Sequence, residues 1–136
     1  MEVLEKSTET IPEAWTQDFP FVDEASIREF AQRIGDTNPL HHYEEAARQE
    51  GLLGIIAPGV MLAGFVSAAI AEEIPGVVAC RLSIDFVAPL YAGSHPTVEC
   101  TVLNQNARMA RLAFTVKNGI EVVAKGSCLL GLPKPK

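Results

Sequence analysis

Hydrophobic positions with helical spacing begin soon after residue 20. Four of them lie at i, i+3, i+4 and i+7, namely Ile27, Phe30, Ala31 and Ile34. Asp23 is a good N-cap because its carboxylate accepts a backbone N–H of the first turn, and Gly35 readily adopts the left-handed conformation that ends a helix. The pattern therefore predicts a helix between Asp23 and Gly35, with Asp36 just beyond its C-terminal end.

Two further helices are predicted from composition. Residues 44–49 begin with two glutamates, which interact favourably with the positive end of a helix dipole, and a short helix is expected there. Pro58 and Gly59 precede residues 60–73, which are apolar on nearly every side. A helix without a polar face is usually buried, so this segment is expected to lie at the centre of the fold.

The second half of the chain alternates between apolar and polar residues, as strands do. Apolar side chains share one face in each of three runs: Leu82, Ile84 and Phe86; Val98, Cys100 and Val102; and Leu112, Phe114 and Val116. Asn118-Gly119 is a strong hairpin signal leading into residues 121–130. One buried helix followed by antiparallel strands predicts an α+β fold in which the sheet wraps around a long central helix.

Composition indicates a single folded domain over residues 1–136, in which residues 1–20 form a loosely organised N-terminal segment. The chain is 48% hydrophobic and only 21% charged, which excludes a disordered protein. Its apolar run over residues 60–71 is shorter than the roughly 20 residues that a membrane-spanning helix needs. The charged N-terminus lacks the apolar centre of a signal peptide, so a cytoplasmic location is expected, without membrane attachment.

Net charge and cysteine content limit the binding partners, disulfides and metal sites that the chain is expected to have. The net charge of −6 argues against nucleic-acid binding, which requires a concentrated basic face. Three widely separated cysteines, Cys80, Cys100 and Cys128, are expected to be reduced residues of the core. Neither a disulfide framework nor a metal site is expected from them.

The segment Gly35-Asp-Thr-Asn-Pro-Leu-His41 carries the candidate chemistry. Pro39 disfavours helical geometry at Asn38, so a loop is expected, and in a loop Asp36 and His41 can face the same small volume. A carboxylate and an imidazole placed in this way can hold a water molecule between an acid and a base. The alternative is a purely structural turn, since Gly, Asp, Asn and Pro are common turn formers. The neighbouring His42 is expected at the surface.

The order of residues in this segment resembles the signature of the MaoC-like, or type 2 (R)-specific, enoyl-CoA hydratases. The matching residues are Phe30, Gly35, Asp36, Asn38, Pro39, His41 and Ala47. The resemblance continues through Ala57-Pro58-Gly59 and through residues 86–93, and it covers roughly residues 21–130. The chain departs from the pattern at Tyr43, where the family usually has Asp, and at Pro58, where it often has His.

The resemblance implies a hotdog fold and a homodimer or larger homo-oligomer. It also implies reversible hydration of trans-2-enoyl-CoA to (R)-3-hydroxyacyl-CoA, with Asp36 and His41 as the catalytic residues. The backbone amide of Gly59 would stabilise the oxyanion, Asn38 would help to orient the loop, and Ser67 would lie close to the catalytic pair. No metal or cofactor is implied, because coenzyme A arrives as part of the substrate.

Three alternatives remain open from the sequence. The chain can be a 3-hydroxyacyl-[acyl-carrier-protein] dehydratase, which differs only in the carrier of the thioester. A hotdog thioesterase is disfavoured because the Asp-x-Asn-Pro-x-His arrangement resembles the hydratases. A non-catalytic subunit that binds acyl thioesters can also retain the loop.

Overall fold

The computed structural model describes residues 11–134 as a five-stranded antiparallel sheet with helices on one side. The elements run in the order β1 (Ala14–Asp18), α2 (Glu24–Arg33), the 3-10 helix η1 (Pro39–His41), α3 (Glu44–Gln49), α4 (Gly59–Glu73), β2 (Val78–Phe86), β3 (Pro96–Gln105), β4 (Met109–Asn118) and β5 (Glu121–Gly131). The strand order across the sheet is β1-β3-β4-β5-β2. Strands β1 and β2 therefore form the two edges.

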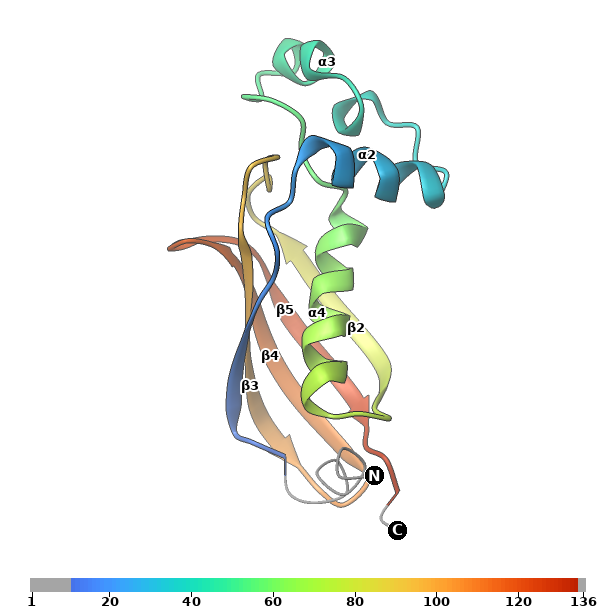
Figure 1. The fold of residues 1–136 in the computed structure, drawn as a ribbon. Coiled ribbons are helices and arrows are strands. Elements are labelled where there is room, and N and C mark those ends of the chain that lie inside the picture. The colour runs from blue at the N-terminus through green and yellow to red at the C-terminus, as the bar shows by residue number, and fades with distance from the viewer. Residues whose placement is uncertain (1–10, 135–136) are drawn as a thin grey trace.

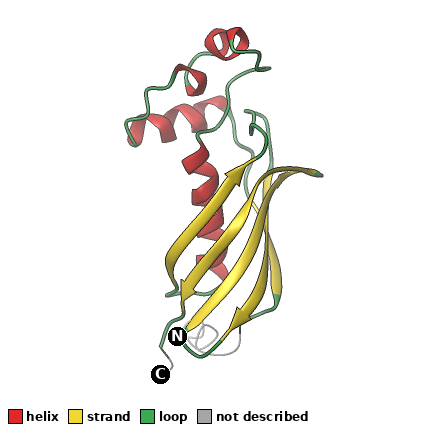
Figure 2. Ribbon diagram, turned by 180° about the vertical axis from the view of Figure 1, so that it is seen from behind, coloured by secondary structure: helices red, strands yellow, loops and turns green. Residues whose placement is uncertain are grey.

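Helix α4 runs along one face of the sheet, and the shorter helices gather at the end where α4 begins (Figure 1). Seen from behind, the strands lie in front of α4 (Figure 2). The core between them is apolar, and its largest fully buried side chains include Ile70, Val66, Leu112 and Leu130. Burial of these side chains drives the sheet to curve around the helix.

The predicted helix boundaries are confirmed. Asp23 caps α2, with its Oδ1 accepting from the Ser26 N–H at 2.7 Å, and Gly35 follows the helix with a φ of 75°. Helix α3 covers residues 44–49, as predicted. The β4–β5 hairpin turns at Gly119, with Asn118 paired to Glu121. Local sequence determines these features, because each depends on contacts within a few residues.

The prediction of a loosely organised N-terminal segment was wrong for Ala14–Asp18, which form β1. Residues 1–10 lie outside the described part of the chain. Strand β1 pairs with β3, with Ala14 opposite Thr101 and Asp18 opposite Thr97. The Trp15 indole Nε1–H also donates to the carbonyl oxygen of Ala69 in α4, at 3.1 Å. Both interactions join residues far apart in sequence, so hydrophobic periodicity in a five-residue segment did not reveal them.

Helix α4 packs against the sheet at the centre of the fold, as predicted, but in the single chain part of its surface is exposed. Its buried residues are Leu62, Val66, Ala69 and Ile70, which share one face. The adjacent edge strand β2 is exposed along almost its whole length. Cys80 on β2 is likewise exposed, whereas Cys100 and Cys128 are buried as expected. Within residues 11–134, part of the α4 surface and the outer edge of β2 are therefore exposed in the single chain.

Candidate active site

The loop after α2 holds Asp36 by three hydrogen bonds. The Asp36 N–H donates to the carbonyl of Ala31 at 2.8 Å, and its carboxylate Oδ1 accepts from the Asn38 N–H at 3.0 Å. Its carbonyl oxygen lies 2.7 Å from Nε2 of His42. The remaining carboxylate oxygen, Oδ2, lies 3.6 Å from Nε2 of His41. One carboxylate oxygen therefore fixes the loop and the other faces the imidazole.

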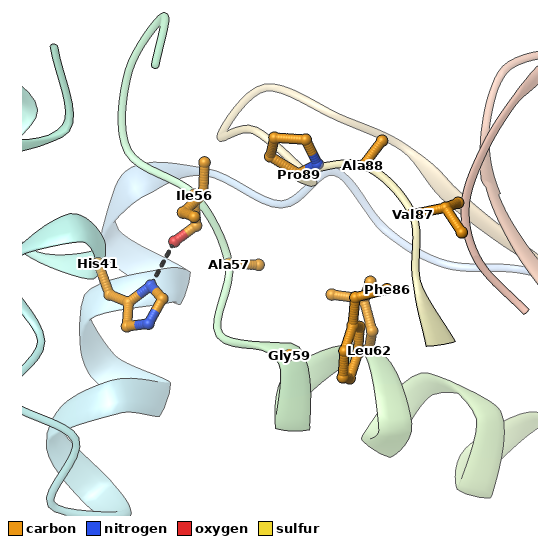
Figure 3. A pocket seen from close by; sticks show the side chains of 9 residues that line it. All are labelled: His41, Ile56, Ala57, Gly59, Leu62, Phe86, Val87, Ala88 and Pro89. Atoms are coloured by element: carbon orange, nitrogen blue, oxygen red, sulfur yellow. Dashed lines mark hydrogen bonds between the residues drawn. The ribbon is translucent and has the colours of Figure 1, made fainter. Parts of the chain in front are cut away.

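The His41 ring is almost completely buried and is held by the backbone of a distant segment. Only 8% of its side chain is exposed, compared with 28% for Asp36. Its Nδ1 lies 2.8 Å from the carbonyl oxygen of Ile56 (Figure 3). A carbonyl oxygen can only accept, so Nδ1 carries the hydrogen and Nε2 has a free lone pair in the neutral ring. That lone pair lies on the side of Asp36.

The Ile56 carbonyl is itself fixed by two neighbouring backbone contacts. The Ile56 N–H donates to the carbonyl of Leu40 at 3.2 Å, and the next residue, Ala57, donates to Leu90 at 2.8 Å. The segment therefore bridges η1 and the chain after β2. The orientation of His41 depends on this tertiary arrangement, and no sequence pattern identified its partner in advance.

A cavity of about 540 Å³ opens beside His41. It is lined by His41, Ile56, Ala57, Gly59, Leu62, Phe86, Val87, Ala88 and Pro89 (Figure 3). Apart from the His41 ring and backbone groups this lining is apolar, which suits a ligand with a hydrocarbon part and one reacting polar group. The sequence did not identify Phe86 and Val87 as lining residues, because β2 was expected to be an ordinary half-buried strand.

Gly59 lies at the junction of the cavity and α4. It is the first residue of α4, so its N–H belongs to the first turn, which has no carbonyl partner within the helix. The positive end of the helix dipole reinforces this donor. The arrangement can stabilise a negative charge that develops in the cavity near His41.

The structure does not bring all five predicted site residues to the same cavity. His41 and Gly59 line it, whereas Asp36 lies beside the His41 ring and is not one of the lining residues. Asn38 caps η1, where its Oδ1 accepts from the Leu40 N–H at 3.1 Å, and it lines a second cavity of about 620 Å³. Ser67 lies on the exposed face of α4. The substrate-binding roles of Asn38 and Ser67 stay predictions.

His42 differs from expectation, since it is half-buried and bonded within the loop. Its one distinguishing signal in the sequence was its position next to His41. Within residues 11–134, no group of three His, Cys, Asp or Glu side chains is arranged to hold a metal ion. Over the same residues, no helix is long and apolar enough to cross a membrane.

Comparison with known proteins identifies the family of this chain. The sequence profile described as the MaoC like domain matches residues 3–124. The chain belongs to the MaoC-like dehydratase family. Its relatives in this family include the 3-hydroxybutyryl-CoA dehydratase of Methylorubrum extorquens, which is 35% identical over 117 residues, 83% of this chain and 74% of the relative. The (R)-specific enoyl-CoA hydratase of Rhodospirillum rubrum is 35% identical over 116 residues, 82% of this chain and 81% of that enzyme.

Structural similarity agrees with the family. The R-hydratase PhaJ1 from Pseudomonas aeruginosa superposes with a TM-score of 0.83 at 25% identity, covering 93% of this chain and 83% of that one. The hotdog fold expected from the resemblance is thereby confirmed, as is membership of a hydratase and dehydratase family of hydro-lyases.

Proposed function

We propose that this MaoC-like protein catalyses the reversible addition of water to trans-2-enoyl-CoA, giving (R)-3-hydroxyacyl-CoA. The observation that carries the proposal is the convergence of His41 Nε2 and Asp36 Oδ2, which lie 3.6 Å apart while the other polar atoms of both side chains are engaged elsewhere. Coenzyme A is favoured as the carrier because the two relatives at 35% identity are named for CoA substrates.

In the proposed reaction, one water molecule is held between His41 Nε2 and Asp36 Oδ2. Its oxygen bonds to C3 of the enoyl group while His41 Nε2 takes one of its protons, and the C2=C3 electron pair moves toward the thioester. The negative charge that reaches the thioester oxygen is stabilised by the Gly59 N–H. The proton held by His41 then passes to C2, which restores the neutral imidazole beside the Asp36 carboxylate.

The experiment follows the ultraviolet absorbance of crotonyl-CoA, which falls as the conjugated double bond is hydrated. Asp36→Asn retains an oxygen for the Asn38 N–H but removes the carboxylate charge, and it is expected to lower kcat by about 10²- to 10⁴-fold. The product is expected to be the (R) enantiomer. Wild-type turnover by Asp36→Asn would contradict the proposal.

Activity on a carrier-bound substrate, release of free thiol and binding of acyl-CoA separate the alternatives. A dehydratase specific for acyl carrier protein would turn over the carrier-bound substrate better than the CoA thioester. A thioesterase would release free thiol. A non-catalytic subunit would bind acyl-CoA without changing the absorbance unless a second subunit were added. The reaction is also expected to continue in the presence of a chelator, because the proposed chemistry needs no metal or cofactor.

We further propose that the protein is a homodimer joined through β2. Strand β2 is an edge with one neighbour, and its exposed apolar side chains include Val78, Leu82 and Phe86. Antiparallel pairing of two copies centred on Ser83 would place Arg81 of each opposite Asp85 of the other. Shifting the centre by one residue in either direction loses both pairs of opposite charge, so electrostatics favours this register.

Cysteine cross-linking tests the register. In a Cys80→Ser background, Ser83→Cys is expected to form a dimer through one disulfide on the two-fold axis, because directly opposed strand residues lie within disulfide distance. Ser127→Cys is the matched control, since Ser127 pairs with Ser83 within one sheet but lies on the inner strand β5. A monomer in solution, or equal cross-linking of both variants, would contradict the proposal.

The three free cysteines also support a reducing, cytoplasmic location.

A further inference from the structure

We propose that His42 is a positioning residue for Asp36, holding the loop so that the Asp36 carboxylate faces His41. The inference rests on the proposed hydration reaction, but the arrangement itself is a set of specific contacts. His42 Nε2 lies 2.7 Å from the carbonyl oxygen of Asp36. Because this oxygen can only accept, Nε2 of His42 carries the hydrogen.

The two adjacent histidines therefore adopt opposite tautomers. His41 donates from Nδ1 to Ile56 and keeps Nε2 free, whereas His42 donates from Nε2 to Asp36. Each tautomer is set by a backbone carbonyl, and the two serve different purposes. The His41 tautomer leaves Nε2 free to act as the base, and the His42 tautomer fixes the main chain of Asp36.

The His42 bond closes the loop across six residues. The other two bonds join Asp36 to Ala31 on α2 and to Asn38 two residues away, and neither engages the carbonyl oxygen of Asp36. The bond from His42 to that oxygen adds a restraint on the peptide after Asp36 from the far end of the loop. Rotation of this peptide would move the carboxylate away from His41, and a displacement of about 1 Å can reduce a rate by about 10²-fold.

Arg28 anchors His42 from the other side. Its Nε donates to the His42 carbonyl at 2.9 Å, and its Nη2 lies 3.1 Å from Glu24 Oε1. A continuous chain of contacts thus runs from α2 through Arg28 and His42 to Asp36. The next residue, Tyr43, offers no side-chain cap to α3. Backbone bonds from the His42 and Tyr43 N–H groups to the Pro39 carbonyl hold this turn locally, and the Arg28 and His42 side chains connect it to α2 and to Asp36.

Three substitutions at position 42 test the inference with matched geometry. Gln places an amide N–H at the same number of bonds from Cα as Nε2, whereas Asn places it at the position of Nδ1. His42→Ala and His42→Asn are expected to lower kcat for crotonyl-CoA by about 10- to 100-fold, with less than about a threefold change in KM. His42→Gln is expected to recover most of kcat.

The outcomes are distinguishable. Wild-type kcat in both His42→Ala and His42→Asn, or equal losses in His42→Asn and His42→Gln, would overturn the inference. A general loss of folding would lower the melting temperature of His42→Asn and His42→Gln alike, without the expected difference between them. If His42→Ala does not fold, the comparison of Asn with Gln is sufficient.

A readout independent of activity separates this inference from the proposed function. In ¹⁵N spectra of the histidine side chains, wild type is expected to show the hydrogen on Nε2 of His42 and on Nδ1 of His41. His42→Gln should preserve the His41 signals, and His42→Asn should shift them. An inactive wild-type protein with these spectra would contradict the proposed reaction but retain the arrangement, whereas the opposite tautomer at His42 would overturn the positioning role itself.

Discussion

The ring of Phe86 covers the α-carbon of Gly59 so closely that a β-carbon built on Gly59 would lie 2.8 Å from Cζ of the ring. The contact joins the first turn of α4 to the end of β2 at the cavity. It explains why position 59 lacks a side chain, since any β-carbon there must displace Phe86.

Gly59→Ala is therefore expected to lower both the melting temperature and kcat/KM. Adding Phe86→Leu should remove the contact and restore part of the stability, giving a coupling free energy of about 0.5–3 kcal/mol. Thermal unfolding of the two single variants and the double variant measures this coupling. Additive effects of the two substitutions would show that the contact does not limit position 59.

His41→Asn separates folding from catalysis at the imidazole. The Asn amide can donate to the Ile56 carbonyl in place of Nδ1, but it offers no counterpart of Nε2. The variant should retain a melting temperature close to wild type while kcat for crotonyl-CoA falls by about 10²- to 10⁴-fold. His41→Gln is the comparison, because it loses the Ile56 bond and should unfold at a lower temperature. Substantial activity in His41→Asn would argue against Nε2 as the base.

Trp15→Phe isolates the hydrogen bond between β1 and α4. The substitution keeps an aromatic ring but removes the indole N–H that donates to Ala69 at 3.1 Å. A loss of about 0.5–1.5 kcal/mol in the free energy of unfolding is expected, as measured by urea denaturation. The slope of unfolding free energy against urea should be unchanged, and an unaltered midpoint would show that the bond contributes nothing to stability.

The two buried cysteines predict a loss of stability at alkaline pH. Burial raises the pKa of the Cys100 thiol to about 12, and burial also raises the pKa of Cys128. In the unfolded chain these thiols ionise near a pH of about 8.5. The unfolded state therefore releases protons first, so this contribution to stability is present below that pH and declines as pH rises toward the folded-state pKa.

The measurement compares urea midpoints at neutral and alkaline pH for wild type and Cys100→Ala. The variant should lose less stability than wild type over the same pH interval, whatever its stability at neutral pH. In native protein, Cys100 is expected to resist alkylation, and all three thiols should react after denaturation. Alkylation of Cys100 in the folded state would contradict its burial.

Local sequence determined the helices, the hairpin and the loop between α2 and α3. Asp23 and Gly35 act on backbone groups within a few residues, so their effects were visible in a short window. The same holds for Asp36 and Asn38, whose side chains bond to main-chain atoms two residues away. A short stretch of sequence therefore predicts the loop that bears the candidate chemistry.

Only the tertiary structure decided how that segment is used. The Ile56 carbonyl that sets the His41 tautomer, the His42 ring that holds Asp36 and the Phe86 ring over Gly59 are contacts that spacing alone did not specify. Strand β1 is likewise held by its pairing with β3 and by the bond from its own Trp15 to the Ala69 carbonyl in α4. Residues a few positions apart can interact in any fold, whereas the partners of Ile56, Phe86 and β1 are brought together only when the sheet has wrapped around α4.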